Sequence, residues 1–180
     1  MSVATHGVAA KHVSFERDRG VYRITVTDGL AHVVVKVSKE SDRQSQVLSI
    51  FRRLADAHIP VFLVKLHRAA VTFAIEAEKI PDVENCISDL NLGLVSSPDV
   101  ALISIIASSM RELSGILVSI ADSLQRAGVR LIAVGDSHNS VQCLVDGSRI
   151  DDAVCELKET FGLNDEIDGI EQVRTTTGNE

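Results

Sequence analysis

Aromatic residues are scarce in this chain of 180 residues, where they make up 3% of the sequence and tryptophan is absent. Only three prolines occur. No apolar run approaches the roughly 18 residues that a membrane-spanning helix needs, so we expect no contact with a membrane. The core must be built from aliphatic side chains, which the 45% hydrophobic content supplies. Such a core favours strands covered by helices.

Basic charge is also in short supply. The chain has 18 Lys and Arg against 25 Asp and Glu, a net charge of -7. Neither a basic stripe nor an aromatic platform is present, so we expect no nucleic-acid partner. The three cysteines, Cys86, Cys143 and Cys155, show no C-x-x-C spacing. We interpret them as small core residues in a reducing compartment, with a redox pair as the weaker alternative. With no apolar signal segment at the N-terminus, the sequence predicts a cytoplasmic protein.

Motifs for catalysis are missing as well. The sequence has no G-x-S-x-G, no Walker A and no G-x-G-x-x-G pattern. The six histidines have no zinc-ligand spacing and are interpreted as solvated or turn residues; they are His6, His12, His32, His58, His67 and His138. We therefore predict no catalytic residues, no metal and no cofactor.

What the sequence does contain is an ordered alternation of short apolar runs and helical patterns. Leu102–Ala107 predicts a strand, and apolar residues at helical spacing predict a helix from Ile116 to Ala127, followed by Gly128. Val129–Val134 and Val141–Val145 predict two more strands. A second helical stripe runs from Val154 to Phe161.

The same pattern occurs earlier in the chain at an offset of 70 positions. Corresponding pairs include Ala31 with Ala101, Val64 with Val134, and Val71 with Val141. No insertion is needed between Ala31 and Glu76, and a fixed offset of this kind indicates duplicated units. The sequence predicts an α+β fold of two tandem ferredoxin-like βαββαβ units.

Three segments of the second unit resemble the ACT domain, and most closely the regulatory half of aspartate kinases. IASSMRELSGI resembles the glycine-rich segment after the first strand of that family, keeping Met110 and Gly115. Gly128–Val145 resembles its "GINIxxISTSEIxISVxV" segment without a gap, and Glu156–Leu163 its closing "ALHxxFxL". The resemblance implies antiparallel sheets with helices on one face, and regulation without catalysis.

The predicted domain organisation follows from these units. Residues 1–20 are expected to form a flexible arm, residues 21–95 the first unit, residues 96–163 the second, and residues 175–180 a disordered tail. Residues from about 168 to 174 are expected to return to the first unit as a strand, as the resemblance implies. Asp28-Gly29 predicts a hairpin turn after a Val21–Val26 strand, and Asn91–Asp99 predicts the join between units.

Candidate effector residues lie where each first strand enters its helix, because a helix N-terminus presents unpaired N–H groups to an α-carboxylate. In the second unit they are Ser108, Met110, Arg111, Glu112, Ser114 and Gly115, facing Gly135, Asp136 and Ser137. In the first unit they are Asp42, Arg43, Gln44, Ser45 and Gln46, facing Lys65 and His67. Ordinary solvated turns remain the alternative for both loops.

The two loops are not equally suited to bind a carboxylate. Gly115 permits close approach to the backbone in the second unit, so we favour that loop. The first unit departs from the family's "SDKPG", because Gln44-Ser45 replaces the Pro-Gly, and from its "QN", because Leu66 and His67 stand there. Lys65 beside such a site would favour an anionic ligand.

The resemblance implies a noncatalytic, amino-acid-sensing regulatory protein of aspartate kinase type, with an effector of the lysine or threonine class at ACT–ACT interfaces. It also implies a homodimer and, as a further expected partner, a catalytic subunit of an aspartate kinase. The alternative is a stand-alone ACT-like dimerisation module that has lost amino-acid binding.

Overall fold

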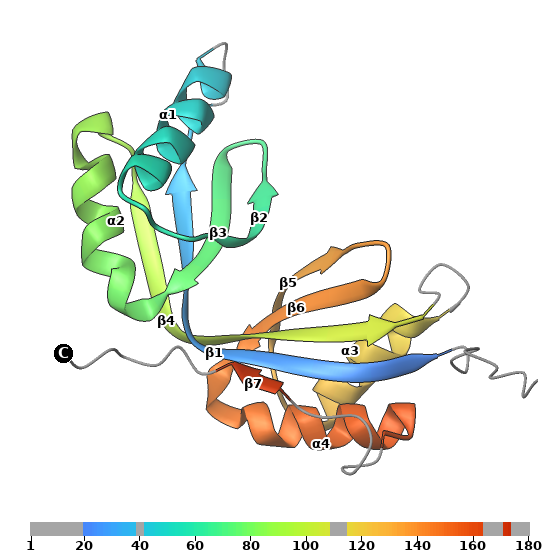
Figure 1. The fold of residues 1–180 in the computed structure, drawn as a ribbon. Helices are drawn as coiled ribbons and strands as arrows, with labels where there is room; N and C mark the ends of the chain where they lie inside the picture. The colour runs from blue at the N-terminus through green and yellow to red at the C-terminus, as the bar shows by residue number, and fades with distance from the viewer. Residues whose placement is uncertain (1–19, 39–41, 109–114, 164–170, 174–180) are drawn as a thin grey trace, which may run out of the picture.

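The computed structural model describes residues 20–38, 42–108, 115–163 and 171–173. Within these residues the fold is α+β, with a single seven-stranded sheet and four α-helices (Figure 1). None of the helices in the described part of the chain is both long and apolar enough to span a bilayer. The predicted fold class is confirmed.

The elements repeat in the same order along the chain. The first set is β1 (Val21–Lys36), α1 (Arg43–Asp56), β2 (Phe62–Leu66), β3 (Ala70–Glu76), η1 (Ala77–Lys79), α2 (Ile80–Ile87) and η2 (Ser88–Leu90). The second set is β4 (Leu94–Ala107), α3 (Ile116–Arg126), β5 (Leu131–Asp136), β6 (Ser140–Asp146), η4 (Gly147–Arg149), α4 (Ile150–Phe161) and β7 (Glu171–Val173). We call α1, β2, β3 and α2, with the adjoining parts of β1 and β4, the first half; α3, β5, β6 and α4, with the other parts of β1 and β4, form the second half.

The strand order is β2-β3-β1-β4-β6-β5, and β7 pairs in parallel with β1. Strands β1 and β4 are long and run antiparallel through both halves, so the halves share one sheet. Figure 1 shows the sheet bending sharply near the middle of these two strands. Gly29 (φ 68°) and Asp99 (φ 61°) adopt left-handed backbone conformations there, and the register between the strands shifts on either side of Leu30. The bend therefore has a local backbone cause.

One sequence prediction about this region is wrong. Asp28-Gly29 does not form a hairpin, because β1 continues through it and both of its parts pair with β4. The segment predicted as the join between the units, Asn91–Asp99, is strand from Leu94 onward, because β4 already begins there. A two-residue turn forms when its flanking strands pair with each other, whereas here the neighbouring strand β4 provides the partner for both.

The predicted repeat is visible in the backbone hydrogen bonds. Val37 N–H donates to Ala69 O at 3.0 Å, and Ala107 N–H donates to Asn139 O at 2.9 Å. Ile59 N–H to Leu54 O and Val129 N–H to Leu124 O, both at 2.9 Å, form a second equivalent pair. Each pair is separated by 70 positions, so the duplicated sequence folds into duplicated turns.

Each half has its own core on the helix-covered face of the sheet. Ile50 and Leu54 of α1 pack on β1 and β3 in the first half, and the equivalent Ile120 and Leu124 of α3 pack on β4 and β6 in the second. A third, smaller core lies at the bend on the uncovered face, which we call the open face. Its buried members are Leu30, Ala74, Val100, Leu102 and Leu144. This third core joins the two halves.

Candidate functional site

The N-terminus of α1 is the first candidate position. The first N–H groups of a helix have no intrahelical acceptor. Asp42, the residue before the helix, makes no capping side-chain hydrogen bond, and the first turn contains no acidic residue. Gln44 and Ser45 are exposed there. The positive end of this helix dipole is thus uncompensated by the chain's own carboxylates in its first turn.

Side chains around this helix end are held by hydrogen bonds. The Gln46 amide donates to Asp42 Oδ2 at 3.2 Å and accepts from Ser38 N–H at 2.7 Å. Arg43 Nη2 donates to the His67 carbonyl oxygen at 2.8 Å. The structure therefore brings the 42–46 segment and His67 together, although they are more than twenty residues apart in the sequence.

The N-terminus of α3 is the second candidate position. Gly115 precedes this helix with φ 79°, a left-handed conformation that glycine adopts readily. The first turn of α3 again contains no acidic residue. Met110, Arg111, Glu112 and Ser114 lie outside the described residues, while Ser108 N–H donates to Gly20 O at 3.2 Å.

The turn facing α3 is locally bonded. Ser137 Oγ lies 2.8 Å from Ser140 Oγ, and Ser137 N–H donates to Ser140 O at 2.8 Å. Asp136 is exposed. Gly135 instead faces the first half, which separates it from the other residues predicted at this site.

Helices α1 and α3 differ from α2 and α4 in the charge of their first turns. The first turn of α2 contains Asp82, and that of α4 contains Asp151 and Asp152. These acids offset the helix dipole, which favours negative charge at its N-terminal end. Among the helices of the described residues, α1 and α3 have no acid in the first turn, although Asp42 directly precedes α1.

The β2 and β5 strands meet across the bend, a contact that the sequence did not indicate. A Cβ atom added at Gly135 would overlap Leu63 Cδ1 and would lie 3.7 Å from Lys65 Nζ. Lys65 and Gly135 occupy equivalent positions in the repeat, 70 residues apart. The offset of 70 positions in the sequence shows that Lys65 and Gly135 are equivalent in the repeat. It does not show that the two residues are in contact.

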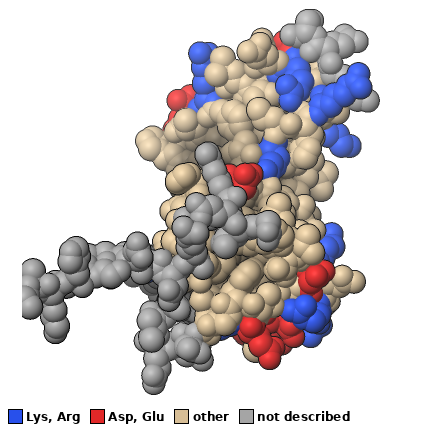
Figure 2. Space-filling view, turned by 90° about the vertical axis from the view of Figure 1, so that its right-hand side faces the viewer, with Lys and Arg blue, Asp and Glu red and all other residues tan. Residues whose placement is uncertain are grey.

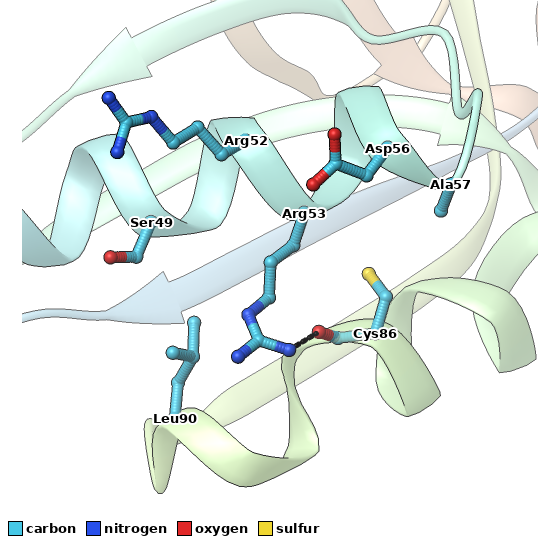
Figure 3. Close-up of a pocket in the computed structure, with 7 residues that line it drawn as sticks. All are labelled: Ser49, Arg52, Arg53, Asp56, Ala57, Cys86 and Leu90. Atoms are coloured by element: carbon cyan, nitrogen blue, oxygen red, sulfur yellow. Dashed lines mark hydrogen bonds between the residues drawn. The ribbon is translucent and has the colours of Figure 1, made fainter.

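A shallow groove of about 550 Å³ between α1 and α2 was also not predicted. Arg53 crosses it from α1 and donates to the Cys86 carbonyl at 3.2 Å (Figure 3). It also donates to Asp89 at 2.6 Å. In the second half, Arg126 of α3 donates to Glu156 and Thr160 of α4 at 2.8 and 2.7 Å.

Burial and hydrogen bonds shift the pKa values of several side chains in the described part of the chain. Burial raises the pKa of the Cys143 thiol to about 12 and also raises the pKa of Cys86, so both thiols stay protonated at neutral pH. Hydrogen bonds from Ser148 lower the pKa of Asp146. Burial, with smaller contributions from His67 and Arg130, lowers the pKa of His32. Among the described residues, His, Cys, Asp and Glu form no group able to hold a metal ion.

Known proteins are similar to this chain in sequence or in fold. Residues 95–159 match the ACT domain family. An aspartokinase from Geobacillus stearothermophilus is 29% identical over 162 residues, which cover 87% of this chain and 39% of that relative. The regulatory subunit of aspartate kinase from Thermus flavus superposes with a TM-score of 0.71 at 12% identity, over 79% of this chain and 99% of that one. A structure of aspartokinase alpha and beta subunits gives a TM-score of 0.72 at 19% identity, again over 79% and 99%.

These similarities show an ACT domain in residues 95–159 and the tandem-ACT fold of aspartate kinase regulatory subunits over the larger part of the chain. The chain spans about two fifths, 39%, of the length of the aspartokinase that it matches. Its fold is that of the regulatory subunit of aspartate kinase from Thermus flavus.

Proposed function

We propose that this chain is a noncatalytic, amino-acid-sensing regulatory protein of aspartate kinase type, which controls aspartate-family amino-acid biosynthesis. The observation that supports this function best is the pair of helix N-termini, at α1 and α3, whose first turns contain no acid. They occupy equivalent places in a tandem-ACT fold. A small amino-acid effector would place its α-carboxylate at such an N-terminus.

The rest of the effector would be recognised by the facing turn. In the second half, oxygen atoms of Asp136 and Ser137 can accept hydrogen bonds from an α-ammonium group. In the first half, Arg43 already occupies the His67 carbonyl, so the second half remains the favoured sensor. The resemblance noted above implies an effector of the lysine or threonine class.

A thermal-shift screen of the amino acids tests this proposal. An effector at 100 times its dissociation constant should stabilise the protein by about 2.7 kcal/mol. Gly115→Val should abolish the ligand-induced shift measured from the variant's own ligand-free melting temperature, and Ser45→Val should reduce it less. Survival of the shift in Gly115→Val and its loss in Ser45→Val would show that the first half is the sensor.

We further propose a cytoplasmic homodimer that can associate with a catalytic subunit of an aspartate kinase. Strands β2 and β5 end the strand order and have unpaired edges. Apolar side chains are exposed on these strands and on the neighbouring helices α1 and α3; they are Leu48, Val64, Leu66, Leu117, Val118 and Leu131. Unpaired edges of this kind invite pairing with a second chain. Sedimentation that shows only monomer at micromolar concentration would exclude the dimer.

A dimerisation module without amino-acid binding is the second candidate function. It is favoured by Gln46, whose amide bridges Ser38 and Asp42 and so occupies space at the N-terminus of α1. The same screen separates the two functions, because this module would dimerise and show no ligand-induced shift with any amino acid.

A further inference from the structure

The junction between β2 and β5 has an asymmetric pair of residues at equivalent repeat positions. Lys65 on β2 extends its ammonium group toward Gly135 on β5, and Gly135 has no side chain to meet it. Leu63 fills the adjacent space against the same glycine. Because any side chain at position 135 would overlap Leu63, the glycine is what permits the two strands to approach here.

A β-bulge places Lys65 in this junction. Phe62 pairs with Ala74 and Lys65 with Thr72, so β2 has one more residue than β3 over this stretch. Ala74 belongs to the core on the open face, and Thr72 lies on the same face two residues away. Successive side chains of a strand point to opposite faces of the sheet, so without the extra residue Lys65 would point toward the helix-covered face. Leu63 in the bulge has φ 44°, a strained conformation for leucine that the packing against Gly135 supports.

Other positively charged or ionisable nitrogen groups lie near Lys65 on the open face. His67 Nε2 lies 3.2 Å from Thr72 Oγ1, beside the position where Lys65 pairs. Burial lowers the pKa of His32, and the nearby His67 and Arg130, one from each half, lower it further, so ionisable groups of both halves lie near His32. The Asp146 carboxylate lies 3.8 Å from the Arg130 guanidinium and offsets part of its positive charge. Figure 2 shows Lys and Arg side chains gathered over the upper part of the molecule, which is the first half.

Lys65 is half-buried, and within the described ranges no hydrogen bond or ion pair to another residue satisfies its ammonium group. Loss of water around a charge is unfavourable unless a partner of opposite charge replaces it. Lys65 lies near the end of β2, and His67 is the first residue after this strand. Two residues of extended chain span about 6.6 Å, from a rise of about 3.3 Å per residue. A small ligand with two anionic groups can contact both.

We propose that the β2–β5 junction binds a small dianion, carrying carboxylate or phosphate groups, between Lys65, His67 and the backbone at Gly135. This inference rests on the proposed function and deepens it, because these residues were predicted as effector contacts of two separate sites. The junction unites them in one site shared by both halves. Lysine is disfavoured there by its positive side chain, so this site and the helix N-termini would take different ligands.

Isothermal titration at constant ionic strength tests the proposal with succinate and inorganic phosphate as separate probes. Lys65→Gln should weaken binding at least about tenfold, as expected for loss of a charge-assisted contact. Gly135→Ala retains Lys65 but displaces Leu63, and it should also weaken binding. Lys36→Gln, which removes an exposed lysine of β1 in the same half, is the matched control and should bind like the unmodified chain.

The two probes identify the source of the anionic group. If succinate binds more tightly than phosphate and its binding depends on Lys65, the ligand is a dicarboxylate. If phosphate binds more tightly and its binding depends on Lys65, the ligand is phosphorylated. Binding of neither probe, or binding that is unchanged in both Lys65→Gln and Gly135→Ala, overturns the inference. Lysine and threonine are titrated in parallel. If one of them binds while both dianions do not, the junction site is refuted and the proposed function stands.

Discussion

An acidic residue placed in the first turn of α1 provides the sharpest test of the helix N-termini. Gln44 is exposed at the second position of the helix, so Gln44→Glu adds charge without altering the core. The carboxylate would interact favourably with the helix dipole and stabilise the ligand-free protein by about 0.3–1 kcal/mol. For a chain of this size, a change of 1 kcal/mol corresponds to about 2–4 °C in melting temperature.

The same substitution should weaken effector binding at that helix. Two unit charges about 4 Å apart repel by about 1 kcal/mol even in water, so the dissociation constant should rise at least about fivefold. Leu117→Glu, at an exposed position in the first turn of α3, makes the equivalent change in the second half. Calorimetric unfolding and titration with the effector, both at low salt, measure the two effects.

Opposite signs of these effects are the diagnostic result: the ligand-free protein becomes more stable while the effector binds less well. Ala55→Glu is the control, because it adds the same charge in the last turn of α1, where it should slightly destabilise the helix and leave binding unchanged. If neither Gln44→Glu nor Leu117→Glu alters the effector's affinity, the α-carboxylate does not bind at these helix N-termini.

Three further predictions concern stability and reactivity. Leu157→Ala should destabilise the protein by about 2–5 kcal/mol in urea titrations, because Leu157 is fully buried between α4 and the sheet, whereas Leu117→Ala on the surface should change stability little. A thiol reagent at pH 8 should modify exposed Cys155 and spare Cys143, whose pKa is raised to about 12, so rapid labelling of Cys143 in native protein by mass spectrometry would contradict the structure. Because the pKa of His32 is lowered in the folded protein, the unfolded state binds a proton at a higher pH than the folded state does. The free energy of unfolding should therefore fall as the pH drops through about 6.5. His32→Gln should flatten this dependence in unfolding titrations between about pH 7 and 5.5.

Local patterns in the sequence were sufficient for the elements and their repetition. The helical stripe through Ile120 and Leu124, and the strand pattern of Val141–Val145, describe which face of each element is buried. These patterns depend on the periods of helix and strand, which are properties of neighbouring residues. The equivalence of the two units followed because the duplicated residues impose the same local constraints twice.

Only the tertiary structure decided how these elements pair. Asp28-Gly29 has the residues of a hairpin turn, yet β4 lies alongside both parts of β1 and competes successfully for their hydrogen bonds. The approach of Lys65 to Gly135 depends on the bend in the shared strands and on the bulge at Leu63. Both arise from contacts between residues far apart in the chain, whose geometry no local periodicity encodes. The sequence alone therefore determined the duplicated α+β units and their cores, and the packing of one half against the other determined which candidate residues meet.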